Sequence, residues 1–365
     1  MSEGHWVSTR RRLIPHLRRL PEPIEARLRR MLPDALLASR AQTARSAVGY
    51  LHPPSTPPST VRPDGTLILL YHRIAVDPDD PFRLCVTPEH FEEHLEVLRR
   101  HSDSVPLTEV LRRSGPAKRA RVAVTFDDGY ADNLHAAGPI LEKAGVPATV
   151  YVTTGSISSD KPLWPLRLEE LFRLGTPRSE RVCVRTHSGT LSVDTPFEGS
   201  RHVALAAAHD QLTPMRPSII AQAMSALEAH FGGEVPSVER RMLDTDELRK
   251  MASSELFRLG AHTRTHSWLS GLSDEDLDFE IKGSKTDLEE IIGVAVSDFA
   301  YPFGTRISFD RSATRSVRRA GFSSATTTID DPLTGGTSRF LLPRHPVYDW
   351  DGEHFERMLL SWLAA

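Results

Sequence analysis

Two short motifs combine residue types that can hold a metal ion. TFDDGY ends an apolar run with two adjacent carboxylates, Asp127 and Asp128. HTRTH follows a second apolar run and sets His262 and His266 four residues apart, a spacing that places both rings on one side of a helical turn. Two neutral imidazoles and one carboxylate can share a divalent ion and leave positions open for water and substrate, as a catalytic metal requires. Taken singly, each motif also fits an ordinary role, the aspartates as the N-cap of a helix and the histidines as unrelated surface residues.

Two further motifs could complete such a site. The run TLILLY is followed by His72, and FAYPFG carries Tyr301, Pro302 and Phe303, which could wall a pocket. A lone histidine is more often structural than catalytic, and packing would explain the aromatic residues equally well. The adjacent aspartates raise a geometric question, because neighbouring residues of a strand point to opposite faces. A turn at the end of the strand would bring both carboxylates toward one pocket.

All four motifs stand where strands of an alternating pattern end. Apolar runs typical of buried parallel strands occupy residues 66–72, 121–128, 148–154, 257–262, 298–302 and 322–328. Helical segments lie between them at 87–100, 131–144, 273–292 and 308–320. This alternation predicts one (β/α) barrel, whose active site lies at the C-terminal ends of its strands.

Three segments depart from the alternation. Residues 155–245 hold a hairpin pattern, RVCVRTHSGTLSVDT, and a helix, and we interpret them as an insertion that forms a lid or a substrate wall. Residues 1–50 interleave arginine with leucine, as in an amphipathic helix on anionic lipid, although a solvated or locally packed helix is the simpler explanation. Residues 51–65 are rich in proline, serine and threonine and are typical of an extended linker. The main domain is then expected over 66–365.

Composition limits the partners. The chain has 365 residues and a formal net charge of -3, which argues against nucleic acid as the main partner because phosphate binding needs a basic surface. The two cysteines, Cys85 and Cys183, provide neither a disulfide framework nor a cysteine zinc site. Charges and prolines interrupt every apolar run that could become a transmembrane helix or a signal-peptide core. We therefore expect a cytoplasmic protein whose N-terminal arm could contact an anionic membrane peripherally.

In this order and context, the motifs resemble those of the polysaccharide deacetylase family. TFDDG followed by H-(S/T)-x-x-H is highly specific for that family, and the resemblance covers roughly residues 66–350. The opening YHRI, with TPEHFEEHLEVL behind it, is similar to the branch that contains poly-N-acetylglucosamine deacetylases. The fold we expect is a distorted (β/α) barrel of seven strands, with an inserted subdomain and a basic N-terminal arm.

The resemblance implies a role for each matching residue. Asp127 would be the general base and His72 the general acid, and the backbone N–H of Tyr130 would help to hold an oxyanion. The ligands of one divalent metal ion would be Asp128, His262 and His266. Zinc suits two histidines and one aspartate, and cobalt, nickel or iron are also compatible.

One position departs from the family pattern. Many members carry an arginine just before the proline of the FAYPFG-like motif, where it fixes the catalytic aspartate, but this chain has Ala300 and Tyr301 there. We predict that Arg344, in LPRHP, supplies this support, because a guanidinium beside Asp127 would keep the carboxylate ionised and oriented. The neighbouring His345 is a second candidate for the general acid.

The activity implied is metal-dependent hydrolysis of acetamido groups on N-acetylhexosamine units of a glycan or glycan precursor, with release of acetate. An O-acetyl esterase acting on a polysaccharide is an alternative that keeps the same metal site. A non-catalytic glycan-binding protein with a vestigial site is a third interpretation. The intact set of acidic and histidine side chains argues against it, because decay usually removes such groups first.

Overall fold

Buried apolar runs form a parallel sheet in the computed structural model of the chain, which describes residues 65–110, 119–158, 163–186, 189–197, 199, 201–232 and 240–364. All of these residues belong to one unit of the chain, Thr56–Ala365. The basic arm expected over 1–50 and nearly all of the linker expected over 51–65 lie outside the described residues. Among the helices that are described, none is both long enough and apolar enough to cross a membrane.

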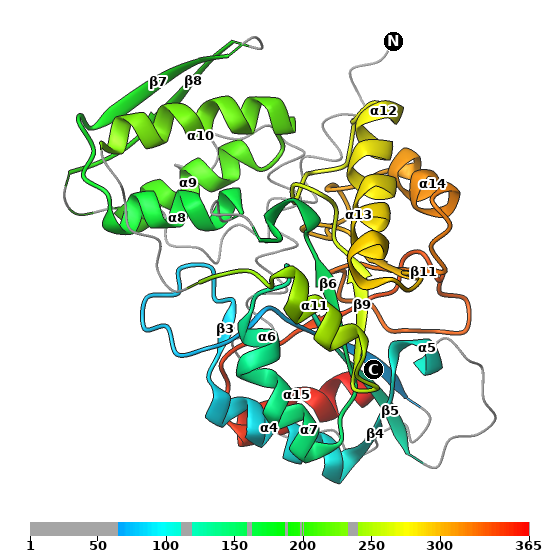
Figure 1. Cartoon of the computed structure of the whole chain (residues 1–365). Coiled ribbons are helices and arrows are strands. Elements are labelled where there is room, and N and C mark those ends of the chain that lie inside the picture. Colours follow the sequence, from blue (N-terminus) through cyan, green and yellow to red (C-terminus); the bar gives the residue numbers. More distant parts are fainter. Residues whose placement is uncertain are drawn as a thin grey trace, which may run out of the picture. The chain divides into compact units, whose positions relative to one another are not determined.

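Seven parallel strands follow one another in the order β11-β10-β9-β6-β5-β1-β12, and an eighth, β4, pairs with β5 beside this path. Their bounds are β1 Thr66–Tyr71, β4 Ser102–Ser104, β5 Ala120–Phe126, β6 Ala148–Val152, β9 Phe257–Ala261, β10 Asp298–Ala300, β11 Ser324–Thr326 and β12 His345–Pro346. The chain just before β12 bridges β11 through Leu342 and Thr326, so one segment pairs with both β11 and β1. The sheet is curled, as Figure 1 shows, and the distorted (β/α) barrel expected from the sequence is confirmed.

The strands β1, β5 and β6 are largely apolar because both faces of the sheet are covered there. In β1 the last five residues are all buried. Tyr71 packs edge-on against Phe91 of helix α4 (Pro88–His101), with 5.2 Å between the ring centroids. At the start of helix α4, Thr87 accepts a hydrogen bond from the N–H of His90, and Pro88 occupies the first turn.

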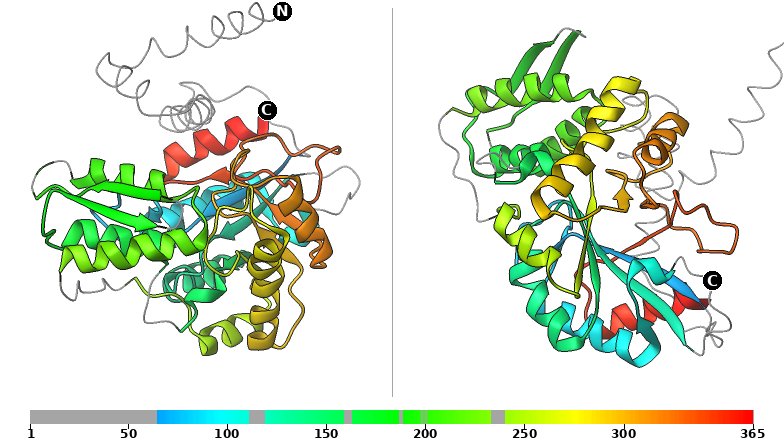
Figure 2. Two further views of the ribbon diagram at one scale, coloured as in Figure 1. Left: turned by 90° about the horizontal axis from the view of Figure 1, so that it is seen from above. Right: turned by 45° about the vertical axis from the view of Figure 1, so that its right-hand side comes forward.

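Helices and short elements surround the barrel. They are β2 Arg73–Ile74, β3 Cys85–Val86, α5 Leu107–Val110, α6 Asp132–His135, α7 Ala137–Ala144, η1 Thr154–Ser156, α11 Thr245–Ala252, α12 Asp274–Leu277, η2 Asp278–Lys282, α13 Gly283–Ile292, α14 Arg311–Arg319 and α15 Gly352–Ala364. Helix α4 packs against both α7 and α15, and the right-hand view of Figure 2 shows the three together at the lower end of the sheet.

The barrel interior is filled from several strands. Ile68 of β1, Ala123 of β5, Tyr151 of β6 and Ala300 of β10 form one buried cluster with Leu342. These residues come from strands that are not all neighbours, so they meet inside the curled sheet. The guanidinium of Arg344 lies over the Tyr151 ring, 5.5 Å from its centroid. The charged side chain of Arg344 therefore lies directly against the buried apolar cluster inside the barrel.

A lobe with its own core follows β6. It consists of α8 Trp164–Leu174, the antiparallel hairpin β7 Arg181–Thr186 and β8 Gly189–Asp194, α9 Arg201–Leu212 and α10 Pro217–Phe231. Leu168, Phe172, Leu205, Leu227 and Phe231 are among the buried residues of this core. In Figure 1 the lobe is the green part at the upper left, with the hairpin above α10. We refer to it below as the inserted lobe.

Candidate active site

A tight turn at the end of β5 brings the two aspartates together. The N–H of Gly129 donates a hydrogen bond to the carbonyl oxygen of Asp127 at 3.0 Å, which closes a three-residue turn around Asp128. Asp128 has a φ of 74° and Gly129 a φ of 84°. A Cβ at position 129 would lie 3.1 Å from a methyl group of Val152, so this turn requires glycine. A positive φ at aspartate costs about 1–3 kcal/mol, and such strain is concentrated at functional sites.

The two histidines are brought together by a loop and not by a helix. Residues 262–267, which we call the histidine loop, have no helical hydrogen bonding, and Thr263 and His266 have positive φ values of 65° and 55°. The helical turn expected from the four-residue spacing is therefore wrong. The rings nevertheless lie close, with 5.1 Å between the centroids of His262 and His266.

Asp128 and the two histidines fit a divalent metal ion. The Nε2 atoms of His262 and His266 lie 3.5 and 3.4 Å from Oδ1 of Asp128. Ligands bound at about 2.0–2.2 Å in a tetrahedral arrangement lie roughly 3.3–3.6 Å from one another. The same Oδ1 atom is buried and accepts no hydrogen bond from any described residue. A buried carboxylate oxygen in this condition is costly unless a cation neutralises it.

The protonation of the histidines also suits a metal. Burial lowers the pKa of His262 to about 4 and that of His266 to about 3, so both rings are neutral at neutral pH. Nδ1 of His262 lies 2.8 Å from the carbonyl oxygen of Ala300, which can only accept a hydrogen bond. Nδ1 therefore carries the proton, and Nε2 presents its lone pair toward Asp128. No sequence signal marks this role of Ala300, because its carbonyl group belongs to the backbone.

Asp127 is paired with Arg344. Two guanidinium nitrogens donate to its two carboxylate oxygens, each at 2.6 Å, and both side chains are almost fully buried. Arg344 also donates to Thr125 and to the carbonyl oxygen of Thr327. Burial alone raises the pKa of Asp127, but the charge and hydrogen bonds of Arg344, together with His262, outweigh it and lower the pKa to about 2. Asp127 is thus an ionised carboxylate, 3.9 Å from Nε2 of His262.

His72 and His345 lie on opposite faces of the sheet. His345 is the parallel partner of Leu69, two residues before the outward-facing Tyr71, so it points outward as well. There its ring stacks on Trp362 at 4.8 Å and Nδ1 lies 2.7 Å from Asp330. His72 lies on the same side as the carboxylates, where its ring and that of His262 partly offset the rise that burial causes in the pKa of Asp128.

The backbone of Tyr130 is free to donate a hydrogen bond. Tyr130 forms an antiparallel bridge with Met242, and the hydrogen bonds of this bridge are made by Ala131 and Leu243. No described residue accepts a hydrogen bond from the N–H of Tyr130. The Tyr130 side chain is buried, so only its backbone is a candidate for contact with a ligand.

The FAYPFG motif divides between packing and the site. Tyr301 is fully buried and stacks on Phe309, with 4.0 Å between centroids, so it belongs to the core. Phe303 is half-buried, with a ring centroid 4.7 Å from that of His266 and a φ of 59°. A positive φ at an aromatic residue is a marked outlier, and the sequence contains no signal for it.

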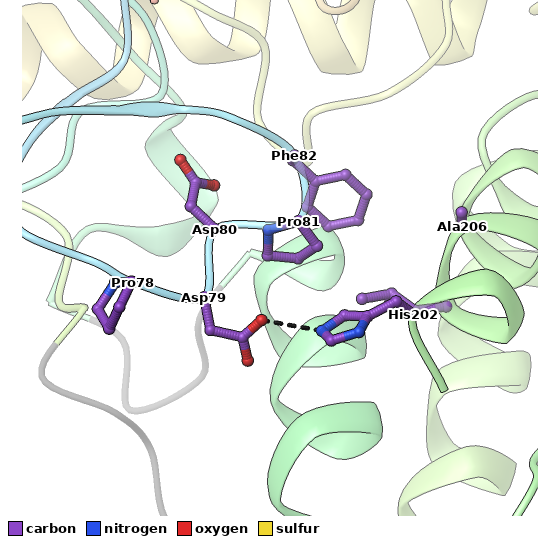
Figure 3. A pocket seen from close by; sticks show the side chains of 8 residues that line it. Pro78, Asp79, Asp80, Pro81, Phe82, His202 and Ala206 are labelled. Atoms are coloured by element: carbon purple, nitrogen blue, oxygen red, sulfur yellow. Dashed lines mark hydrogen bonds and ion pairs between the residues drawn. The ribbon is translucent and has the colours of Figure 1, made fainter. Parts of the chain in front are cut away.

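Rings of the inserted lobe lie next to Phe303. His209 of α9 lies 6.2 Å from Phe303, and its ring is stacked on Trp164 of α8 and lies 4.8 Å from Phe82. Phe82 borders a cavity of about 330 Å³ between the chain after β2 and α9, shown in Figure 3. The dashed line there joins His202 to Asp79 at 2.8 Å. The sequence did not predict these neighbours, because they come from three separate segments.

A known protein family matches the part of the chain that carries the candidate metal site. The model of the polysaccharide deacetylase family matches residues 114–189 and 208–325, just over half of the chain. The chain belongs to the polysaccharide deacetylase family. Asp127 and the three proposed metal ligands lie inside the matched ranges, whereas His72 and Arg344 lie outside them.

One relative is similar in sequence, and two solved structures are similar in fold. YxkH of Bacillus subtilis (strain 168), provisionally named a polysaccharide deacetylase, is 31% identical over 124 residues, which are 32% of this chain and 42% of YxkH. IcaB from Ammonifex degensii aligns with a TM-score of 0.54 and 17% identity over 84% of this chain and 100% of IcaB. The deacetylase PplD of Streptococcus pyogenes, solved in complex with acetate, aligns with a TM-score of 0.53 and 19% identity over 83% of this chain and 100% of PplD.

Proposed function

We propose that the chain is a metal-dependent deacetylase that hydrolyses the acetamido group of N-acetylhexosamine units in a glycan or glycan precursor. The observation that carries this proposal is the pairing of an ionised Asp127 with the cluster of Asp128, His262 and His266 less than 4 Å away. A divalent ion held by that cluster, zinc or alternatively cobalt, nickel or iron, would polarise the acetyl carbonyl and make a water molecule more acidic.

The residues of the chain have separate tasks in this reaction. Asp127 accepts a proton from water as the water oxygen attacks the acetyl carbon. The N–H of Tyr130 donates to the oxygen that becomes negative, and Arg344 keeps Asp127 ionised and oriented. His72, in its protonated form, delivers a proton to the sugar nitrogen as the carbon–nitrogen bond breaks. A protonated histidine on the leaving-group side favours an amide substrate over an ester, since an amine leaves poorly without a proton.

Acetate release tests the proposal and its dependence on metal. We expect N-acetylglucosamine oligomers to yield equal amounts of acetate and free amine, chelation to stop the reaction, and added zinc or cobalt to restore it. His262→Ala should contain less metal than the wild type by elemental analysis, since one of three ligands is lost. Acetate from an O-acetylated polysaccharide alone would replace the proposal with an esterase. No acetate from either substrate would indicate a glycan-binding protein, and full metal occupancy in His262→Ala would contradict the metal site.

The general acid can be tested by changing the leaving group. We expect His72→Ala to lose most of its activity on the acetamido sugar, by about 10²–10⁴-fold, and much less on an acetate ester of a phenol, whose leaving group needs little protonation. His345→Ala is the matched control, because its ring faces Trp362 and Asp330 on the other side of the sheet. We expect it to retain turnover per folded molecule on both substrates. An amide-selective loss in His345→Ala, with none in His72→Ala, would move the acid to β12.

A further inference from the structure

We propose that Glu280 is a positioning residue, which fixes the shape of the histidine loop and thereby sets the affinity of the metal site. This role rests on the metal site of the proposed function. Glu280 is not one of the proposed metal ligands and acts on the loop that carries two of them. Glu280 lies in the π-turn η2, between α12 and α13, and none of its surface is exposed.

All four hydrogen bonds of the Glu280 carboxylate go to the histidine loop. Oε2 accepts the backbone N–H groups of Arg264 and Thr265, each at 3.0 Å. Oε1 accepts the hydroxyl groups of Thr265 at 2.6 Å and of Ser267 at 3.0 Å. Every donor lies within two residues of His266: three belong to Arg264 and Thr265, between the two histidines, and the fourth belongs to Ser267, just after them. A buried carboxylate that accepts four hydrogen bonds is firmly held in one position.

The loop needs such support because its backbone is strained. Thr263 and His266 both adopt positive φ, at a cost of about 1–3 kcal/mol each. On one side the loop is held by η1, where the N–H groups of Thr154 and Gly155 donate to the carbonyl oxygens of Thr263 and Arg264. These bonds use the carbonyl groups of the loop. Glu280 accepts hydrogen bonds from N–H groups of the loop, so η1 and Glu280 together hold both the carbonyl and the N–H groups of its backbone.

The π-turn explains how Glu280 reaches the loop. One additional residue in a helical turn rotates all later residues by about 100° relative to an uninterrupted α-helix. The turn over Asp278–Lys282 allows Glu280 to face the histidine loop, while α13 after it presents Asp287 to the side chain of Arg264. Gly283 lies between them, where a Cβ would meet the Arg264 guanidinium at 2.5 Å. π-turns of this kind are frequent at functional sites.

Co²⁺ binding measured without substrate tests the role. Glu280→Met has a similar length and no carboxylate, so we expect its dissociation constant for Co²⁺ to rise about 10–100-fold, as is typical when the support of metal ligands is lost. The visible absorption of bound Co²⁺ should change as well, because the ligands are no longer held in one arrangement. Glu280→Gln should stay near the wild type, since its amide oxygen can accept both N–H groups and its NH2 can donate to the two hydroxyl oxygens. Wild-type affinity and spectrum in Glu280→Met would overturn the proposal.

Glu170→Met is the matched control, because Glu170 is an equally buried glutamate in the inserted lobe, paired with Arg167. It should lower thermal stability and leave Co²⁺ binding unchanged; equal weakening in both variants would overturn a specific role for Glu280. Should Glu280→Met not fold, Thr265→Val removes one donor and must also weaken Co²⁺ binding. A wild-type protein that binds Co²⁺ but releases no acetate would overturn the proposed function, and weak binding by Glu280→Met would still support this inference.

Discussion

Asp127→Asn should lower turnover by about 10²–10⁴-fold while the protein still binds metal. The amide is nearly isosteric with the carboxylate but cannot accept a proton from water, so the proposed general base is lost. The proposed metal ligands Asp128, His262 and His266 are unchanged in this variant. Acetate release per folded molecule, measured beside metal content, separates loss of the base from loss of the metal.

The structure adds a cost in stability that the sequence did not suggest. Replacement of the carboxylate by a nearly isosteric amide preserves the volume of the side chain. Both carboxylate oxygens of Asp127, however, accept hydrogen bonds from Arg344, and an amide nitrogen in one of these positions would face an N–H group. The free energy of unfolding of the variant should therefore fall, and turnover must be referred to the folded fraction.

Asp310→Ala serves as the control for this experiment. Asp310 caps α14 by accepting hydrogen bonds from the N–H groups of Ser312 and Ala313, so the variant should lose stability, on the order of 1 kcal/mol, and keep its turnover. Near-normal turnover in Asp127→Asn would mean that another group acts as the base.

The strands that position the site could be predicted because their composition alone marks them. The runs that became β1, β5 and β6 are almost wholly buried, and their largely apolar sequence follows from that burial. Strand β12 could not be predicted in this way. It has only two residues, His345 and Pro346, and its extended conformation depends on pairing with β1.

The candidate site was predictable in its residue types and less so in its geometry. The motifs single out the ligand types in sequence, but the shape of the histidine loop depends on Glu280, 14 positions after His266, and on the carbonyl group of Ala300. The choice between His72 and His345 could not be made from sequence either. The proposal of His72 rests on the register of β12 with β1, which directs the side chain of Arg344 inward and that of His345 outward.

Arg344→Met should destabilise the protein by about 3–5 kcal/mol at neutral pH, because it leaves the buried Asp127 carboxylate without its cation. Burial would then raise the pKa of Asp127, where in the wild type Arg344 helps to lower it to about 2. A protonated Asp127 cannot act as the base, so turnover should fall as well. Denaturant unfolding of metal-free protein measures the stability, and Arg344→Lys, which keeps the charge but not the paired hydrogen bonds, should lie between the variant and the wild type.

The pH dependence distinguishes this account from a simple packing defect. In the wild type, the pKa of Asp127 is lowered from 3.8, so its contribution to stability is complete above that value and is lost as the pH falls toward about 2. In Arg344→Met, a raised pKa lets Asp127 take up a proton at higher pH, which relieves the buried charge. The difference in unfolding free energy between the two proteins should therefore be largest at about pH 7 and shrink toward about pH 4. Arg306→Met, which breaks the exposed ion pair with Asp331, is the control and should cost about 0–1 kcal/mol. If the difference in unfolding free energy for Arg344→Met stays constant with pH, lost packing destabilises the variant, and the unpaired carboxylate does not.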